Sequence, residues 1–271
     1  MRDSVRFSVI IPNFNEGKYI RECLESVFNQ TYKNYEVIVI DDGSTDDSLD
    51  IIKDFDVKLY HSNGLHAGGA RNLGLDNTNG EYVVFLDSDD YLASNDVLEK
   101  LNSLINNEDI IFLNYTMSIN GEFEVRHDME GDLSEKIERT SYLGAPTKCF
   151  KRTLIGDTRF PVCQRYEDIV FTIENMCKAN SCTELKDSFF IYRKVANSNS
   201  TSALDVEAIM AVITEIIKLY KLCVKYPKYK DNLLKRIKND KIDKRFGIIN
   251  YMLENNIESL EVKEFFDLLN K

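Results

Sequence analysis

The first hundred residues alternate short apolar runs with segments whose apolar residues recur at helical spacing, and this alternation constrains the fold more than any other feature of the chain. The apolar runs, which are rich in β-branched residues, cover residues 7–11, 36–40, 57–60 and 82–86. Apolar residues three and four positions apart predict helices within residues 20–28, 47–55 and 67–75. Strands this apolar are buried on both faces, so the pattern predicts a mostly parallel central sheet flanked by helices.

Polar clusters follow three of the four predicted strands. They are Asn13-Phe14-Asn15-Glu16, Asp41-Asp42-Gly43-Ser44 and Asp87-Ser88-Asp89-Asp90. In open α/β sheets, ligands bind outside the carboxyl ends of the strands. The three clusters are therefore expected to converge on one ligand site at that edge.

The Asp87-Ser88-Asp89 triplet is the most informative of these clusters. Its two carboxylates flank one residue at the end of a buried strand, so both can lean over the edge of the sheet. Carboxylate oxygens suit Mg²⁺ or Mn²⁺, ions that keep positions open for phosphate oxygens. The triplet equally fits a turn in which one aspartate caps the next helix, and the residues alone leave both interpretations open.

The remaining polar segments also have two interpretations each. The segment Asp41–Asp42-Gly43-Ser44 is either an Asx-type turn or a place where a carboxylate accepts the imide N–H of uracil or thymine. Around Phe14, the chain forms either an ordinary loop or a surface on which that ring stacks on a base. Gly68-Gly69-Ala70-Arg71 matches neither GxGxxG nor GxxxxGK[ST]. It is either a tight helix start or a helix N-terminus that faces phosphate with an arginine.

The motifs PNFNE, DDGSTD, GGARNLGL and GEYVVFLDSDDYL resemble glycosyltransferase family 2 in their order and spacing. The resemblance is dense over residues 7–92, and it resumes more loosely over residues 148–171 and 192–200. It implies an α/β GT-A (Rossmann-like) fold in which residues 1–202 form the catalytic domain. Within it, residues 1–118 would be the nucleotide-sugar-binding half and 119–202 the acceptor-side half. Residues 203–271 match no motif and are expected to form a C-terminal helical extension.

The resemblance also implies roles for individual residues. Asp89, together with Asp87, would bind Mn²⁺ or Mg²⁺. Asp168 would be the catalytic base, with Glu167 beside it, and the segment from Tyr192 to Ser200 would close over the donor. The residues expected to contact a nucleotide-sugar donor are Pro12, Phe14, Asn15, Glu16, Asp42, Gly69, Arg71, Asp87, Ser88, Arg193, Ser198 and Ser200.

One departure from the family's pattern lies on the acceptor side. Many relatives carry an aromatic residue before the segment that is Lys148-Cys149-Phe150-Lys151 in this chain. Here Ala145-Pro146-Thr147 stands in that place. An unusual acceptor pocket is therefore expected.

The reaction that the resemblance implies is an inverting transfer from a nucleotide-diphosphate sugar to an acceptor hydroxyl. A metal ion would offset the charge that develops on the diphosphate, while Asp168 takes the hydroxyl proton. UDP-sugars are the family's commonest donors. The family's commonest setting is cell-surface polysaccharide or glycoconjugate synthesis, in which the acceptor is a glycan, a lipid-linked molecule or a protein.

Two other functions stay open at this point. A sugar nucleotidylyltransferase on a similar sheet would have a Gly-rich signature with a basic residue directly after the first strand, and Pro12-Asn13-Phe14-Asn15 is not one. A non-catalytic nucleotide-sugar-binding module is the second alternative. The presence of every expected acidic residue argues against it.

Composition narrows the partners and the compartment. A formal net charge of −11 gives no electrostatic footprint for nucleic acid. Six cysteines without a CxxC pair suit a reducing compartment. The chain has no apolar leader and no run of about eighteen apolar residues, so a cytoplasmic location is expected.

A basic stretch lies between Lys225 and Arg245, where nine Lys/Arg residues accompany three aspartates. It is either a solvated helix face or a patch for peripheral contact with an anionic membrane. The sequence predicts no oligomeric state.

Overall fold

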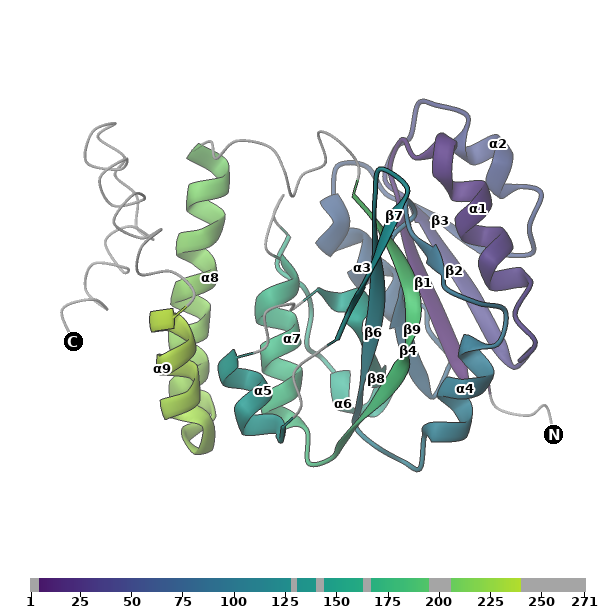
Figure 1. The fold of residues 1–271 in the computed structure, drawn as a ribbon. Coiled ribbons are helices and arrows are strands. Elements are labelled where there is room, and N and C mark those ends of the chain that lie inside the picture. Colours follow the sequence, from purple (N-terminus) through teal and green to yellow (C-terminus); the bar gives the residue numbers. More distant parts are fainter. Residues whose placement is uncertain (1–4, 128–130, 140–143, 163–166, 195–205, 240–271) are drawn as a thin grey trace.

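A nine-stranded mixed sheet forms the centre of the molecule in the computed structural model, which describes residues 5–127, 131–139, 144–162, 167–194 and 206–239 (Figure 1). The strand order is β3-β2-β1-β4-β8-β6-β9-β5, and β7 pairs with β6 outside this path. The sheet has a regular parallel half and a mixed half. The predicted α/β architecture is confirmed.

The parallel half consists of four strands in the order β3-β2-β1-β4. They are β1 (Phe7–Asn13), β2 (Tyr35–Asp41), β3 (Lys58–His61) and β4 (Tyr82–Phe85). β1 continues past Pro12, where a strand end was expected. Pro12 has no N–H to donate, but β4 pairs with β1 only as far as Ile10, so the proline interrupts no pairing on that side.

Helices cover both faces of the parallel half, because alternate strand residues point to opposite faces. Val9 and Val39 pack with α1 (Gly17–Phe28) and α4 (Val97–Leu104). Ile10 and Ile40 pack on the other face with α3 (His66–Asp76). A Cβ on Gly74 would lie 2.5 Å from the Cγ2 of Ile10, so this glycine lets α3 approach the sheet closely. α2 (Ser48–Ile52) is shorter than the predicted helix.

The mixed half is assembled from strands that are distant in sequence. β6 (Ile110–Ile119) lies between β8 (Lys148–Lys151), which is antiparallel to it, and β9 (Cys182–Arg193), which is parallel. β7 (Glu122–Arg126) and the two-residue β5 (Tyr91–Leu92) add antiparallel edges. β8 joins the halves by pairing antiparallel with β4.

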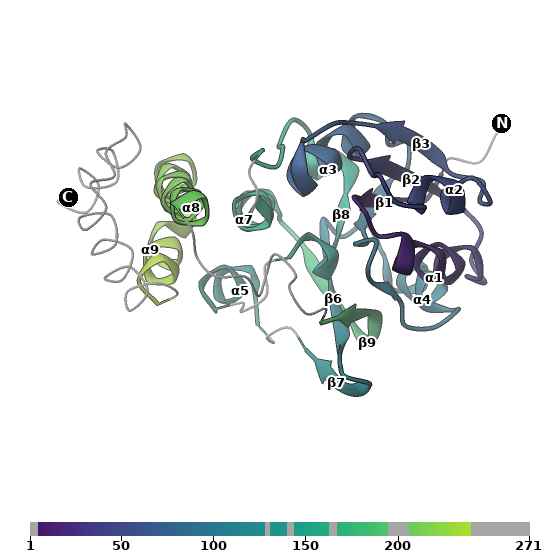
Figure 2. The same cartoon turned by 90° about the horizontal axis from the view of Figure 1, so that it is seen from above.

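Further helices lie beyond the mixed half. Figure 2 shows α7 (Glu167–Lys178) beside the sheet and α8 (Val206–Lys225) farther out. Ile216 and Leu219 of α8 belong to the same hydrophobic cluster as Phe171 of α7. The remaining helices are α5 (Leu133–Arg139), η1 (Ala145–Thr147), α6 (Arg152–Ile155), η2 (Pro227–Tyr229) and α9 (Lys230–Asn239).

The domain boundary and the apolar character of the helices are the last features of the fold. The expected domain boundary between residues 202 and 203 lies outside the described residues and stays a prediction. Within the described ranges, none of the helices has the length and apolar character needed to cross a membrane.

Candidate active site

The crevice between β1 and β4 is where the three polar clusters meet. The chain runs outward from β1 to β2 and β3, then returns to place β4 on the other side of β1. Such a reversal of strand order opens a crevice at the carboxyl ends of the strands. Asn13, at the end of β1, lies level with Asp41, at the end of β2, and Asp87 follows β4.

Side-chain hydrogen bonds brace the loops that follow β1 and β2. The Asn13 amide donates to Asp41 Oδ1 at 2.9 Å, and Asp41 Oδ2 accepts the backbone N–H groups of Gly43 and Ser44, as in an Asx turn. Asn15 has a positive φ of 55°, and its Oδ1 accepts the N–H of Thr45 at 2.8 Å. These bonds hold the rim of the crevice in one shape.

Asp42 holds the start of α3. Its Oδ1 accepts hydrogen bonds from the Ser62 hydroxyl and from the N–H of Leu65, and its Oδ2 accepts the N–H of His66. The side chain is buried. The predicted base-binding aspartate is therefore also the residue that fixes the entrance of α3.

Other predicted donor contacts lie around the same crevice with different exposure. Phe14 is 57% exposed, so its ring presents a face to solvent. Pro12 is half-buried, whereas Ser88 and Gly69 are buried. A Cβ on Gly69 would lie 2.6 Å from the Cβ of Leu65, so the first turn of α3 leaves no room for a side chain there.

Glu16, Asp87 and Asp89 form an acidic group at the mouth of the crevice. Burial, together with repulsion from the neighbouring Asp87 and Glu16, raises the pKa of Asp89 to about 7. Burial also raises the pKa of Glu16, with added repulsion from Asp46 and Asp87. Carboxylates that disfavour each other's charge in this way are stabilised by a cation.

The donor set fits Mn²⁺ or Mg²⁺ held jointly with a ligand. Among the described residues, no three His, Cys, Asp or Glu side chains lie close enough to hold a metal ion by themselves. Mg²⁺ is commonly held by one or two carboxylates together with substrate phosphates, so Asp89 and Asp87 match that mode. Asp87 is also one-third exposed, which leaves oxygen available toward the crevice.

Arg71 of α3 connects the acidic group to the start of α7. Its Nη2 lies 2.7 Å from Asp87 Oδ1, and its Nη1 lies 2.7 Å from Glu167 Oε1 and 2.9 Å from Asp168 Oδ1. The guanidinium is buried, and it lies 5.6 Å from the ring centroid of Phe160. One cation therefore meets three carboxylates from the two halves of the sheet.

Asp168 lies where α7 reaches the crevice. Its Oδ2 accepts the N–H of Ala145 at 3.2 Å, so the departure from the family's pattern lies directly against this carboxylate. Burial raises the pKa of Asp168; Arg71 opposes this rise, while Glu167 and Asp87 add to it. A raised pKa makes the carboxylate a stronger base than an exposed aspartate.

Asp90 joins the crevice to β9, and the sequence predicted no role for it. Its Oδ1 accepts the N–H of Arg193 at 2.8 Å, and its Oδ2 has no hydrogen-bond partner among the described residues. Burial raises the pKa of Asp90 well above its usual range. The sequence feature that could have indicated a role for Asp90 is its position as the fourth residue of the Asp87–Asp90 cluster.

The residues predicted to close over the donor are described only in part. The Arg193 guanidinium pairs with Glu22 at 2.8 Å and lies over the rings of Tyr19 and Tyr91. Ser198 and Ser200 lie outside the described residues.

Comparison with known sequences identifies relatives over most of the chain. The profile of Glycosyl transferase family 2 matches residues 8–185. The chain is 27% identical over 245 residues to glycosyltransferase GlyG of Streptococcus pneumoniae, covering 80% of each protein. It is 31% identical over 203 residues to the poly(ribitol-phosphate) beta-N-acetylglucosaminyltransferase TarS of Staphylococcus aureus. That match covers 69% of this chain and about a third (35%) of TarS.

Solved structures agree with the sequence matches. Residues 1–349 of S. aureus TarS in complex with UDP-GlcNAc superimpose with a TM-score of 0.74 and 25% identity, covering 90% of this chain and 79% of that one. The mannosyltransferase PcManGT of Pyrobaculum calidifontis, in complex with GDP-Man and Mn²⁺, has a TM-score of 0.61 and covers 98% and 78%. At 16% identity this second likeness concerns the fold alone.

Proposed function

This chain belongs to glycosyltransferase family 2, and from that membership we propose that it is a metal-dependent, inverting glycosyltransferase that moves a sugar from a UDP-sugar to an acceptor hydroxyl. One observation carries the proposal: Arg71 bridges Asp87, in the predicted donor site, and Asp168, the predicted base. A displacement at a sugar carbon needs a leaving group on one side and a base on the other. The ion pairs hold the two candidates for these tasks in one fixed arrangement.

On the donor side, the residues bind and orient the nucleotide. The Phe14 ring stacks on the base, and Asp42 and Glu16 contact the nucleoside at the end of β2 and the start of α1. Asp89 and Asp87 would hold Mn²⁺ or Mg²⁺, which as a Lewis acid offsets charge on the departing diphosphate. Arg71 adds a fixed positive charge next to Asp87.

On the acceptor side, Asp168 takes the proton of the attacking hydroxyl. Its Oδ1 is held by Arg71 and its Oδ2 by the N–H of Ala145, so the carboxylate keeps one orientation. Attack from the face opposite the diphosphate inverts the anomeric carbon in a single displacement. Glu167 shares the Arg71 guanidinium and helps to position it.

The relatives support a donor and a setting. TarS binds UDP-GlcNAc in its solved structure, and its name describes a sugar transfer to poly(ribitol-phosphate). We propose a UDP-sugar donor and an acceptor in cell-surface polysaccharide or glycoconjugate synthesis, with transfer taking place in the cytoplasm. This chain spans about a third of TarS, so we do not assign the acceptor of TarS to it.

Nucleotide release tests the proposal against its two alternatives. Thermal shift with UDP-, GDP- and dTDP-sugars in Mn²⁺ first selects the donor, because a ligand stabilises the folded state that binds it. A glycosyltransferase then releases nucleoside diphosphate faster with acceptor and stops when EDTA is added. A binding module shows the thermal shift without release. A nucleotidylyltransferase instead releases pyrophosphate from a nucleoside triphosphate and a sugar phosphate.

A further inference from the structure

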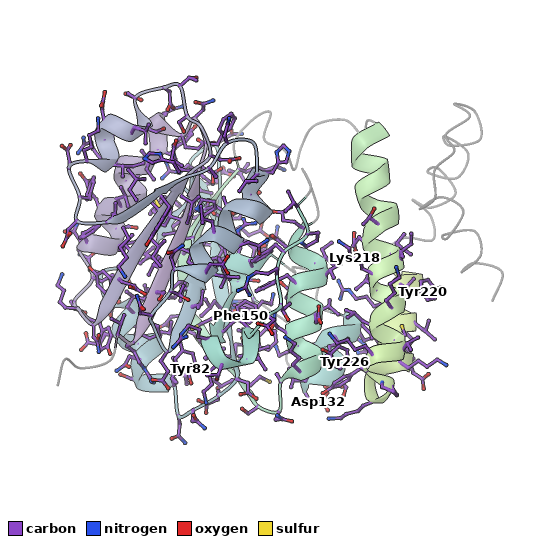
Figure 3. The ribbon with its side chains drawn as sticks, turned by 180° about the vertical axis from the view of Figure 1, so that it is seen from behind. Tyr82, Asp132, Phe150, Lys218, Tyr220 and Tyr226 are labelled. Atoms are coloured by element: carbon purple, nitrogen blue, oxygen red, sulfur yellow. The ribbon has the colours of Figure 1, made fainter. Side chains whose placement is uncertain are left out.

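The turn that carries the proposed metal ligands begins at the end of a buried strand. β4 rises from Tyr82, labelled near the lower end of the sheet in Figure 3, toward the crevice. Directly after β4, the N–H of Leu86 donates to the carbonyl oxygen of Ile10 at 3.0 Å. The N–H of Asp90 then donates to the carbonyl oxygen of Asp87 at 3.0 Å, which closes a four-residue β-turn. The first end of this turn is therefore held by β1 of the parallel half.

Exposure alternates along the turn. Asp87 and Asp89 are partly exposed, whereas Ser88 and Asp90 are buried. Asp90 is 1% exposed, so its carboxylate has almost no surface in the crevice. A metal ligand has to offer an oxygen there. The side chain of Asp90 is therefore placed to hold the turn from the inside rather than to bind the metal ion.

Asp90 ties the second end of the turn to β9. Its Oδ1 accepts the N–H of Arg193 at 2.8 Å. The next two residues of the chain form β5, in which Tyr91 pairs antiparallel with Ile191 of β9. The Asp90 carboxylate thus adds one more hydrogen bond to the β5–β9 ladder, at the end that meets the turn. The parallel half holds one end of the turn and the mixed half holds the other.

The end of β9 is itself anchored to α1. The Arg193 guanidinium pairs with Glu22 at 2.8 Å, and it lies 5.0 Å and 4.7 Å from the ring centroids of Tyr19 and Tyr91. Because Tyr91 directly follows Asp90, the backbone and the side chain of Arg193 hold neighbouring residues of one segment. The Glu22 side chain is 56% exposed, and exposed ion pairs contribute little. The hydrogen bond to the buried Asp90 is therefore the stronger of the two attachments.

We propose that Asp90 is a positioning residue for the metal site, which places Asp89 by tying the turn to β9. This inference rests on the proposed glycosyltransferase function and adds to it a residue that contacts neither the donor nor the metal ion. Mg²⁺ accepts its oxygen ligands at about 2.0–2.1 Å in near-octahedral geometry, so a small shift of the turn is enough to weaken binding. Asp87 is also held by Arg71. Asp89 is therefore the ligand that depends on Asp90.

The Mn²⁺ concentration that gives half-maximal UDP binding to the full chain tests the proposal. Asp90→Ala leaves the Arg193 N–H without its acceptor, and this concentration should rise at least tenfold, since residues that orient metal ligands change metal affinity by about 10–100-fold. Asp90→Asn keeps an oxygen for the N–H but removes the carboxylate, so it should stay within about threefold of wild type. An equal rise in both variants would make Asp90 a metal ligand and overturn the inference. Unchanged binding in Asp90→Ala would overturn it too.

Asp109→Ala is the matched control. Asp109 Oδ2 likewise accepts a backbone N–H, that of Asn180 at 2.8 Å, but just before the start of β6 and β9 and so at the far end of these strands. Urea unfolding measures the stability of both alanine variants, and the Mn²⁺ requirement should change in Asp90→Ala alone. A similar rise in Asp109→Ala would reduce the effect to a general loss of stability and overturn the inference.

Further measurements keep this inference separate from the proposed function. Asp90→Ser, whose hydroxyl ends one atom short of the Arg193 N–H, covers the case in which Asp90→Ala does not fold, and it should raise the Mn²⁺ requirement at least threefold. Uridine has no phosphate, so its binding in EDTA should stay within about twofold of wild type in Asp90→Ala. Uridine binding that falls as much as UDP binding would assign Asp90 to the whole crevice and overturn the inference. A wild type that binds no UDP in Mn²⁺ would instead count against the proposed function.

Discussion

The parallel and mixed halves of the sheet bring their functional groups to the crevice in different ways. In the parallel half, the end of each strand delivers a polar residue, and local hydrogen bonds such as Asn13 to Asp41 brace neighbouring loops. In the mixed half, Asp168 reaches the crevice from a helix and is held by a buried arginine from the other half. The residues proposed for donor recognition thus lie at the edge of the sheet, whereas the proposed base depends on a tertiary ion-pair network.

Arg71→Ala should have the largest effect, because it breaks the link between the two halves. Three carboxylates would be left around a buried site without their cation, and removing one partner of a buried ion pair costs about 3–5 kcal/mol. Urea unfolding should show a loss of that size, and both donor binding and transfer should fall.

Arg71→Lys is the matched control for this variant. It keeps the charge but loses the fork that reaches Asp87 and Glu167 at once, so part of the stability should return while transfer stays low. Unchanged stability in Arg71→Ala would mean that the halves do not depend on this network.

Asp89→Ala should affect the donor site alone. We expect metal-dependent UDP affinity to fall about a hundredfold or more, a change of about 2.8 kcal/mol. Removing Asp89 also relieves repulsion with Asp87 and Glu16, so the fold should be at least as stable. Calorimetry with Mn²⁺ and with EDTA measures this; equal affinity in both buffers for wild type and variant would contradict the metal assignment.

Glu36→Gln tests the opposite end of the parallel strands, away from the crevice. Burial alone would raise the pKa of Glu36, but hydrogen bonds from Lys58, Ser8 and Asn79 lower it to about 2, from the ordinary 4.5. Its stabilising contribution is therefore complete above pH 4.5 and is lost as the pH falls toward 2. The variant should lose about 2 kcal/mol at pH 7 and less at pH 3.

UDP binding is the control for Glu36→Gln, and it should stay unchanged at neutral pH. Weakened UDP binding would show that the two ends of the parallel strands are coupled.

The positive charge of the basic stretch from Lys225 to Arg245 should make the smallest of these contributions, a weak attraction to anionic membrane. Lys225 pairs with Glu174, Lys235 lies 3.3 Å from Glu138, and the buried Arg236 donates to the carbonyl of Ile137. The stretch beyond residue 239 lies outside the described residues. Co-sedimentation with anionic liposomes should be weak and should decrease with salt. Equal binding to neutral liposomes would leave only the solvated-face interpretation.

The two halves also differ in how far the sequence predicted them. Continuous apolar runs predicted the strands at residues 7–11 and 82–86, and the polar clusters after them predicted the position of the crevice. In the mixed half, the two-residue β5 and the seven-residue α5 were not predicted, because they are too short to show a periodicity of their own. The helix α4 was not predicted either, although Val97, Leu101 and Leu104 recur at helical spacing. Their structure comes from packing against strands that are distant in sequence.

Long-range contacts explain what the sequence could not predict about the site. The bond from Arg71 to Asp168 joins residues 97 positions apart, and only the resemblance to a family suggested that both serve one reaction. Asp90 binds the backbone of Arg193, 103 positions away, and no local pattern indicates that contact.

The paired measurement of UDP-sugar affinity and transfer rate in Asp168→Asn tests the central claim most directly. Asparagine keeps the shape of the side chain and can still accept the N–H of Ala145, but it cannot act as a base. Donor affinity should stay within a few-fold of wild type, while transfer falls by about 10²–10⁴, the usual contribution of a general base. Glu167→Gln should be milder, because we propose that Glu167 positions Arg71 and does not take the proton. Near-normal transfer in Asp168→Asn would remove Asp168 as the base, and lost donor binding would place it on the nucleotide side.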